Sequence, residues 1–327
     1  MKSMIDEEKK LIEVVNLKKY FPITGGLFNK KIGNVKAVEK INFSIKQGEV
    51  LGLVGESGSG KTTLGRAILR LIELTEGKVF FENTEINSLS EKEMRNFRKN
   101  MQIIFQDPFA SLDPRKRIFN IIAHGLKLHT TLNKEELIDV VSELLKQVDL
   151  QPEHINRYPH EFSGGQRQRI GIARALALKP KFIVADEPVS ALDVSIQAQI
   201  LNLLQDLKEQ YSLTMLFISH DLSVINHVAD RVMVMYLGRI VEIADAEELY
   251  SNPSHPYTKS LLEVAPTINA VKNKKKDILK GDIPSPINPP SGCVFRTRCP
   301  LANSECAKII PELKKINTDH FVSCLKK

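Results

Sequence analysis

The feature that most constrains this chain is a glycine-rich loop between a buried strand and a helix. Residues Gly55–Thr62 match the pattern G-x-x-x-x-G-K-[ST] in full. The apolar run Val50–Val54 predicts a strand before the loop, and Leu64–Leu71 predicts a helix after it. Glycines let backbone N–H groups turn inward around an anion, and the positive end of the following helix points to the same place. The stretch therefore predicts a nucleotide site, and a glycine-rich turn without a ligand is the alternative.

Individual residues of the loop have distinct expected roles. Lys61 would reach the β- and γ-phosphates of the nucleotide, and the Thr62 hydroxyl would be a ligand of Mg²⁺. The other loop residues would surround the phosphates with backbone N–H groups, and they are Gly55, Glu56, Ser57, Gly58, Ser59, Gly60 and Thr63.

Composition narrows the class of protein. The chain has 327 residues, enough for about two domains. Its 46 Lys and Arg against 39 Asp and Glu give a net charge of +7, which fits nucleic acid, an anionic membrane surface or a basic tail. Part of this excess lies in one late segment that we interpret as a solvated linker, with Lys272, Lys274, Lys275, Lys276 and Lys280.

Neither a membrane span nor a secretion signal is visible in the sequence. No run reaches the roughly 18 consecutive apolar residues that a membrane helix needs. The first ten residues have no apolar core like that of a signal peptide. We therefore expect a cytosolic protein, in which disulfides are rare.

Hydrophobic patterning predicts an α/β protein. Around the loop we expect a short strand at Ile12–Val15, a half-buried strand pair at Val35–Ile45, and further strands at Gly77–Phe81 and Ile103–Phe105. We also expect an aromatic turn at Tyr20–Pro22 and a loop at Thr24–Gly33. Strands and helices that alternate from Phe182 to Met235 are typical of a parallel sheet, and Gly238 indicates a turn between two short strands.

The chain is also expected to divide into parts. Amphipathic spacing predicts an inserted helical subdomain over residues 107–178, which ends in a helix, Gly165–Leu178, that Ser163 caps. Prolines become frequent beyond about residue 252. We therefore expect a first domain of residues 1–250 and a separate extension of residues 251–327.

Two acidic residues extend the expected nucleotide site. Asp186 and Glu187 come at the carboxyl end of the apolar strand Phe182–Asp186, the edge of a parallel sheet at which nucleotides bind. Asp186 would hold Mg²⁺ through water, because that ion keeps much of its hydration shell. Glu187 would polarise the attacking water as a general base. The alternative is a pair of acids that cap a helix.

A second helix start could also bind an anion. Ser163-Gly164-Gly165-Gln166 begins the helix that follows the inserted region. By itself this is ordinary capping chemistry, but free N–H groups among small residues at a helix N-terminus are suited to an anion. Two such places in a chain with one triphosphate suggest that each site is completed by a second copy.

These motifs occur in the order found in the ATPase subunits of ABC transporters, and the chain resembles that family over residues 11–250. The resemblance rests on Walker A at Gly55–Thr62, Gln106, the signature Ser163–Gln166, Walker B at Phe182–Asp186 with Glu187, Ser190–Asp193, and His220. Arg157–Ser163, Val189–Gln199 and Ser285–Pro300 look like the ATP-binding subunits of oligopeptide and dipeptide permeases, the F-type subunits above all.

The resemblance implies the fold class and the cofactors. The fold would be an α/β P-loop NTPase, with a RecA-like parallel sheet, an antiparallel β subdomain and an inserted helical subdomain. A small cysteine-containing extension would follow this cassette. The cofactors would be ATP and Mg²⁺.

It also implies roles for residues outside the loop. In a head-to-tail dimer, Ser163 and Gly165, with their neighbours Gly164 and Gln166, would contact the γ-phosphate bound to the partner cassette. Asp193 would lie on the dimer interface.

Gln106 and His220 depend on the resemblance for their roles. Gln106 would sense Mg²⁺ and the attacking water, and would couple them to the membrane subunits. His220 would bind the γ-phosphate and hold Glu187 and the water in place. Without the resemblance, Gln106 is a solvent-facing amide and His220 a structural hydrogen-bonding group. Phe21 falls at the family's usual place for the ring that stacks on adenine, and the adjacent Tyr20 is the alternative.

The four cysteines are confined to the extension, as Cys293, Cys299, Cys306 and Cys324. Thiols gathered in a cytosolic chain suggest a metal or cluster site, although the C-x-x-C spacing typical of zinc is absent. Some members of the peptide-permease family hold a 4Fe-4S cluster in a similar motif. We therefore expect an iron–sulfur cluster, with zinc or four unlinked thiols as alternatives.

The function implied is an ATP-hydrolysing subunit of an importer for oligopeptides or dipeptides, peripheral at the cytoplasmic face of the cell membrane. Its partners would be a second related ATPase subunit, two transmembrane permease subunits and, indirectly, an extracytoplasmic peptide-binding protein. The same machinery importing another small solute such as nickel is one alternative. A soluble ABC ATPase acting on nucleic acid or ribosomes is another, but the single cassette and compact insert lead us to expect no nucleic-acid partner.

Overall fold

The computed structural model describes residues 9–25, 30–264 and 281–327, which form two compact units. The helical unit contains Lys46–Gly48 and Ser88–Phe217. The β-rich unit contains the described residues of Lys10–Ile45, Glu49–Asn87 and Ile218–Lys327. The lysine cluster at residues 272–280 lies outside the described residues.

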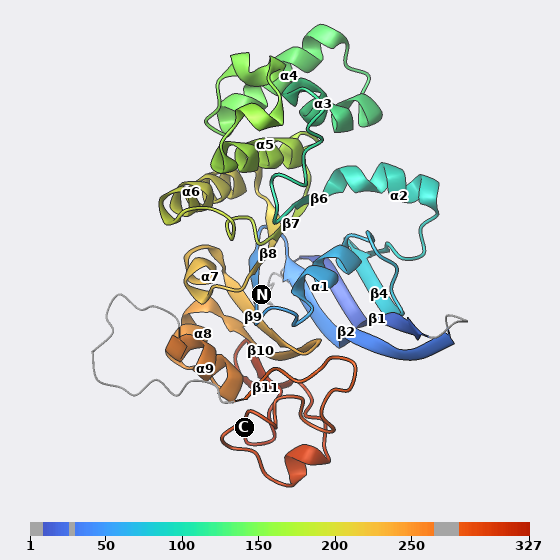
Figure 1. The fold of residues 1–327 in the computed structure, drawn as a ribbon, viewed down its shortest axis with the longest axis vertical. Coiled ribbons are helices and arrows are strands. Elements are labelled where there is room, and N and C mark those ends of the chain that lie inside the picture. The colour runs from blue at the N-terminus through green and yellow to red at the C-terminus, as the bar shows by residue number, and fades with distance from the viewer. Residues whose placement is uncertain (1–8, 26–29, 265–280) are drawn as a thin grey trace, which may run out of the picture. The chain divides into compact units, whose positions relative to one another are not determined.

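The helical unit combines helices α2 to α6, which run from turquoise through green to yellow in Figure 1, with strands in the order β8-β7-β6. Its helices are α2 (Glu91–Phe97), α3 (Ile118–His129), α4 (Lys134–Gln147), α5 (Gly164–Leu176) and α6 (Val194–Tyr211). Its strands are β6 (Met101–Ile104), β7 (Phe182–Asp186) and β8 (Thr214–Ser219), the last of which continues into the β-rich unit. Strands β6 and β7 run parallel, with Met101 opposite Phe182.

Capping boxes mark the starts of three of these helices, α2, α4 and α5. The Asn133 side chain accepts from the N–H groups of Glu135 and Glu136 at the start of α4. Ser163 and Gln166 form the same reciprocal pair at the start of α5. Each box satisfies N–H groups that have no partner within the helix. The predicted helix capped by Ser163 is confirmed, and it ends at Leu176 rather than Leu178.

The β-rich unit contains a four-stranded sheet in the order β2-β1-β4-β5. Its strands are β1 (Lys10–Gly25), β2 (Lys30–Lys46), β4 (Glu76–Phe81) and β5 (Thr84–Glu85). Strand β1 pairs antiparallel with β4, and its register shifts between Val15 and Lys18, where Asn16 has a φ of +49°.

Two sequence predictions are wrong in this sheet. Tyr20–Pro22 does not form a turn, because β1 continues through these residues beyond the bulge at Asn16. Val35–Ile45 does not form a pair of strands, because it belongs to the single strand β2. Lys40, with a φ of +52°, interrupts the regular alternation of β2. The pattern of residues was local, whereas pairing with a partner strand decides where a strand ends.

A second group of strands has the order β11-β12-β10-β9-β3, and its strand β3 leads into the predicted loop. They are β3 (Val50–Val54), β9 (Arg231–Tyr236), β10 (Arg239–Asp245), β11 (Lys314–Asn317) and β12 (His320–Val322). All five residues of β3 are buried, and β3 runs parallel to β9. The predicted strand at Val50–Val54 and the predicted turn at Gly238, with a φ of +76°, are confirmed.

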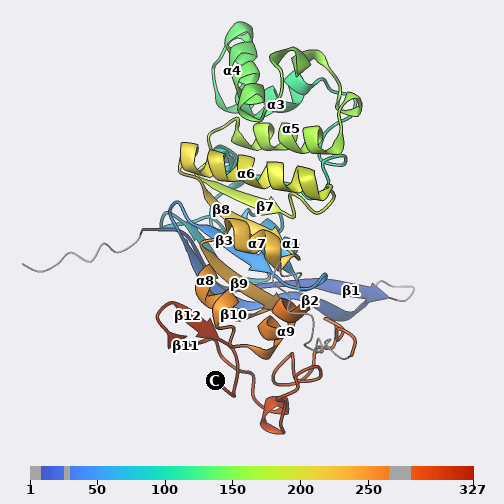
Figure 2. The same cartoon turned by 90° about the vertical axis from the view of Figure 1, so that its left-hand side faces the viewer.

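The helices of the β-rich unit are short. They are α1 (Lys61–Ile68), α7 (Leu222–Val228), α8 (Ala246–Ser251) and α9 (Pro256–Val264). Helix α1 begins three positions earlier than the predicted Leu64, because the loop leads directly into its first turn. Figure 2 shows the hairpin β11–β12 beside β10, so the late part of the chain adds strands to the group that contains β3.

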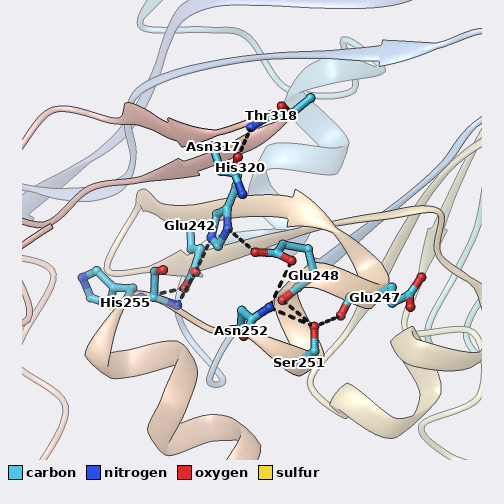
Figure 3. A network of polar contacts seen from close by, with 10 residues as sticks. Glu242, Glu247, Glu248, Ser251, Asn252, His255, Asn317, Thr318 and His320 are labelled. Atoms are coloured by element: carbon cyan, nitrogen blue, oxygen red, sulfur yellow. Dashed lines mark hydrogen bonds and ion pairs between the residues drawn. The ribbon is translucent and has the colours of Figure 1, made fainter.

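A buried carboxylate fastens this hairpin (Figure 3). Glu242 of β10 is fully buried, and its oxygens accept from the N–H groups of Ser254 and His255 at 2.7 and 2.9 Å. Nε2 of His320, on β12, lies 2.7 Å from the same carboxylate. His320 Nδ1 lies 3.5 Å from Glu248 of α8. The network therefore joins β10, β12, α8 and the start of α9.

The elements confirm the predicted fold class, a mixed α/β protein with parallel and antiparallel strands and helices between them. Within the residues described, no helix is both long and apolar enough to cross a lipid bilayer.

Candidate nucleotide site

The predicted phosphate loop lies in the β-rich unit, between β3 and α1. Lys61 is only 5% exposed, and its ammonium donates to the carbonyl oxygens of Gly55 and Glu56 at 2.7 and 3.2 Å. The lysine therefore bends back over the loop that it follows. An ammonium held inside a ring of backbone groups is placed to meet a phosphate that enters the ring.

Two glycines of the loop leave no room for a side chain. A Cβ atom on Gly55 would lie 2.2 Å from the Met235 carbonyl oxygen. A Cβ atom on Gly60 would lie 2.1 Å from the carbonyl oxygen of Ala37, and Gly60 has a φ of +106°. Close backbone approach therefore requires glycine at both positions, and the left-handed conformation requires it at Gly60 as well.

The start of α1 is suited to an anion. No side chain caps it, and its first turn contains no acidic residue, so no side-chain carboxylate of that turn competes with an anion for the positive end of the helix. The Ser59 hydroxyl is buried and has no hydrogen-bond partner among the described residues. A phosphate in the loop would accept from the Ser59 hydroxyl and lie at the positive end of the helix, so the described residues fit the expected nucleotide.

The predicted catalytic acids lie in the helical unit. Asp186 ends β7 and is 2% exposed. Glu187 follows it with a φ of +47°, a left-handed conformation that costs a non-glycine residue about 1 kcal/mol. Gln106 donates from Nε2 to Oε2 of Glu187 at 2.9 Å. The structure thus brings together Gln106 and Glu187, which are far apart in the sequence.

Ser163–Gln166 also lies in the helical unit, at the start of α5. Gln166 N–H donates to the Ser163 hydroxyl at 3.3 Å, and Ser163 N–H donates to the Gln166 side chain at 3.0 Å. A Cβ atom on Gly165 would lie 2.6 Å from Cγ2 of Ile196 in α6, so this glycine permits close packing of the two helices. Asp193, at the start of α6, is exposed and makes no capping hydrogen bond there.

His220 lies in the β-rich unit, immediately after β8, and is exposed. The next residue, Asp221, caps α7 by accepting from the Ser223 N–H at 2.8 Å. The helix that follows therefore begins without using the histidine side chain as its cap.

The two candidate aromatic residues differ in their surroundings. The Tyr20 hydroxyl donates to Glu39 at 2.8 Å, and burial together with this bond raises the pKa of Tyr20 to about 12. The Phe21 side chain is 39% exposed, and Lys19 Nζ lies 4.9 Å from the centre of its ring. Phe21 is thus the more accessible of the two rings for stacking.

The four cysteines are all unpaired, and the expected iron–sulfur cluster or zinc site is not supported. The N–H of Cys293 donates to the carbonyl of Cys306 at 2.8 Å. Burial, and to a smaller extent the neighbouring cysteines, raises the pKa of the Cys293 and Cys299 thiols, which favours the protonated forms. No cluster of three or more potential ligands with metal-binding geometry occurs in the described part of the chain.

Sequence reasoning did not identify two residues that contact the loop. The Tyr257 hydroxyl accepts from the N–H of Glu56, and Arg298 binds the Glu56 carboxylate. They follow Glu56 by 201 and 242 positions, so no local pattern connects them with it. The only available signal was the presence of aromatic and basic residues among the prolines of the extension.

Two family models match separate parts of the chain. Residues 38–190 match the model described as ABC transporter. Residues 241–306 match the model described as the C-terminal region of oligopeptide/dipeptide transporters. The second match contains Glu242, Tyr257 and Arg298.

Curated relatives match nearly the whole chain. The oligopeptide transport ATP-binding protein AppF of Bacillus subtilis is 54% identical over 97% of this chain and 97% of its own length. The oligopeptide transport ATP-binding protein OppF of Salmonella typhimurium is 50% identical over 100% of this chain and 99% of its own length.

A solved structure shares the fold. It is the post-hydrolysis dimer of an ATP-binding cassette bound to ADP and Pi, which is 29% identical to this chain with a TM-score of 0.64. The match covers 72% of this chain and 98% of that one. Fold, motifs and relatives agree, and the chain belongs to the ABC transporter ATPases, among the ATP-binding subunits of oligopeptide and dipeptide transporters.

Proposed function

We propose that this chain binds and hydrolyses ATP at Gly55–Thr63 to energise the import of oligopeptides or dipeptides. The observation that carries the proposal is the loop itself, in which Lys61 is held against the Gly55 and Glu56 carbonyls at an uncapped helix start. Its family supplies the class of reaction, an ATPase coupled to transport.

Binding of the nucleotide is assigned to groups that suit each part of it. Lys61 and the N–H groups of Gly55–Thr63 would hold the phosphates, while Thr62, Gln106 and Asp186 would hold Mg²⁺. Mg²⁺ neutralises charge on the β- and γ-phosphates when it is bound. Phe21 stacks on adenine, which fits its exposed ring, whereas the hydroxyl of Tyr20 is committed to Glu39. Such stacking stabilises by about 1–3 kcal/mol and discriminates poorly between bases.

Hydrolysis is assigned to Glu187 as the general base. The Gln106 amide donates to one carboxylate oxygen of Glu187 at 2.9 Å, and this contact orients the acid. His220 contacts the γ-phosphate and holds the attacking water. A positioned base of this kind accelerates a reaction by about 10²–10⁴-fold.

A second cassette completes each site. Ser163, Gly164, Gly165 and Gln166 of one chain contact the γ-phosphate on the other, and Asp193 lies on their interface. The exposure of Asp193 is compatible with that role. The related cassette bound to ADP and Pi was solved as a dimer, which supports the same assembly here. We assign the second position to a related but different ATPase subunit.

The remaining partners follow from the transporter family. Two transmembrane permease subunits hold the cassettes at the cytoplasmic face of the membrane, and a peptide-binding protein delivers the substrate to them. We assign residues 1–250 of this chain to the cassette, with the helical insert at 107–178, and residues 251–327 to the extension. An iron–sulfur cluster is not part of the proposal, because the described thiols form no metal-binding group.

The proposal is tested by reconstitution with the cognate membrane subunits and a panel of peptides. ATP-dependent uptake of peptides supports it. Uptake of nickel or another solute alone would keep the assignment as a transport ATPase but would change the assigned substrate. Glu187→Gln is expected to bind ATP normally, to accumulate a closed ATP-bound dimer and to lose at least about 100-fold in turnover. Turnover equal to that of the wild type would show that Glu187 is not the base.

A further inference from the structure

An acidic side chain occupies a loop that is built to receive a polyanion. Glu56 directly follows the first glycine of the motif. A carboxylate next to a triphosphate repels it, and the repulsion grows where protein excludes water. The loop therefore needs a way to cancel this charge.

Arg298 of the extension supplies the opposite charge. Its two terminal nitrogens donate to the two Glu56 carboxylate oxygens at 2.6 and 3.0 Å, a two-point contact. The side chain of Arg298 is 6% exposed and that of Glu56 is 24% exposed. The contact with Glu56 raises the pKa of the guanidinium, so Arg298 remains a cation. A planar guanidinium suits both oxygens at once, which a lysine ammonium does not.

A second contact from the extension fixes the backbone at the same position. The N–H of Glu56 donates to the Tyr257 hydroxyl at 2.9 Å. Tyr257 is fully buried, and its ring packs against Tyr236 and Phe295, with ring centres 4.7 and 5.4 Å apart. Its hydroxyl is therefore a rigid acceptor. Both the charge and the backbone of Glu56 are held by residues from the late part of the chain.

We propose that Arg298 is a positioning residue for ATP binding, which neutralises Glu56 and fixes the entrance of the phosphate loop. The affinity of the loop for ATP thereby depends on the extension. This inference rests on the proposed role of Gly55–Thr63 as the ATP site. Arg298 acts through Glu56 and touches no reacting atom.

The test measures ATP affinity of the full-length chain, by calorimetry with Mg²⁺ present. Arg298→Ala leaves the Glu56 charge bare and is expected to raise the Kd for ATP roughly tenfold. The KM for ATP rises in parallel, whereas kcat at saturating ATP stays near the wild-type value. Adding Glu56→Gln to Arg298→Ala removes the bare charge and recovers most of the lost affinity. A merely structural loss would not be repaired by a second substitution.

The matched control is Arg296→Ala. Arg296 belongs to the same segment, but it donates to the Ser291 carbonyl at 2.9 Å, within the extension. Its substitution is expected to leave the Kd unchanged. Should Arg298→Ala fail to fold, Arg298→Lys replaces it, because it keeps the charge but loses the two-point contact, and about a threefold rise in Kd is expected.

Each outcome separates the inference from the function on which it rests. If the wild type binds ATP and Lys61→Ala does not, the loop is the ATP site. Wild-type affinity in the Arg298 variants would then overturn the inference alone, as would a double variant no better than Arg298→Ala. If the wild type itself binds no ATP, the proposed function is overturned and the inference with it.

Discussion

Single residues decide how the β-rich unit responds to acid, and His255 is the clearest case. Its side chain is 1% exposed, its Nδ1 accepts from the N–H of Tyr257 at 3.1 Å, and burial lowers its pKa to about 4. In the unfolded chain a histidine takes up a proton below a pH of about 6.5. Between pH 6.5 and 4 the unfolded state therefore binds a proton that the folded state does not, and folding stability falls as the pH falls.

His255→Asn is expected to remove this acid sensitivity. An asparagine carbonyl can accept the same N–H two residues on, and it does not titrate. The wild type is expected to lose up to about 3 kcal/mol of unfolding free energy from this residue between pH 7 and pH 4. Urea unfolding of both proteins across that range measures the difference. Parallel pH profiles would contradict the assignment.

The glycines of the loop give a second prediction at this scale. Gly60→Ala places a Cβ atom 2.1 Å from the Ala37 carbonyl and forces a non-glycine residue to a φ of +106°. Gly58→Ala is the matched control, because Gly58 has a φ of +78° but nothing within 4 Å of its added Cβ. Gly58→Ala is expected to lower the unfolding free energy by about 1–2 kcal/mol. Gly60→Ala is expected to lower it by clearly more and to abolish ATP binding. Thermal unfolding and ATP titration compare them.

Residue spacing predicted the loop, its strand and Asp186 at the end of β7, because each belongs to a short pattern with a local physical cause. It did not predict Tyr257 or Arg298, whose contacts with Glu56 arise only from folding. The iron–sulfur expectation was not supported for a related reason. Spacing places four thiols in one segment, but it does not arrange them around a metal.

At the scale of elements, the start of a helix depends on local residues more than the end of a strand does. A helix such as α4 carries its own start signal, Asn133 with Glu136, and its own buried stripe. Strand β1 was predicted too short, because its pairing with β4 across the Asn16 bulge keeps it extended to Gly25. Pairing energy comes from another part of the chain, which the local sequence of β1 does not contain.

Asn133→Ala tests how much a single cap contributes to α4. The substitution leaves the N–H groups of Glu135 and Glu136 without their side-chain acceptor. The expected loss is about 1 kcal/mol of unfolding free energy. Asn133→Asp should stay within a few tenths of a kcal/mol of the wild type, because aspartate caps equally well. Equal stability of all three proteins in urea would show that the cap is dispensable.

At the scale of the molecule, the Glu242 network links strands that are far apart in the chain. His320→Ala would leave a fully buried carboxylate without one of its partners. Removal of one partner from such a pair costs about 3–5 kcal/mol. The double variant Glu242→Leu/His320→Leu removes both polar groups and should be less destabilised than the single one, although Ser254 and His255 lose their acceptor. Chemical unfolding ranks the variants. An unfolding free energy of His320→Ala equal to that of the wild type would show that the histidine does not stabilise the buried carboxylate.

The position of His320 has a consequence for biosynthesis. The carboxylate of Glu242 is translated 78 residues before the histidine that lies against it. While the ribosome is still extending the chain, β10 therefore carries an acidic group that its final environment does not yet accommodate. A product truncated before residue 320 would keep the buried carboxylate without its histidine partner. The pairing of β12 with β10 can therefore form only after the late hairpin has been translated, so this part of the fold is completed late in synthesis.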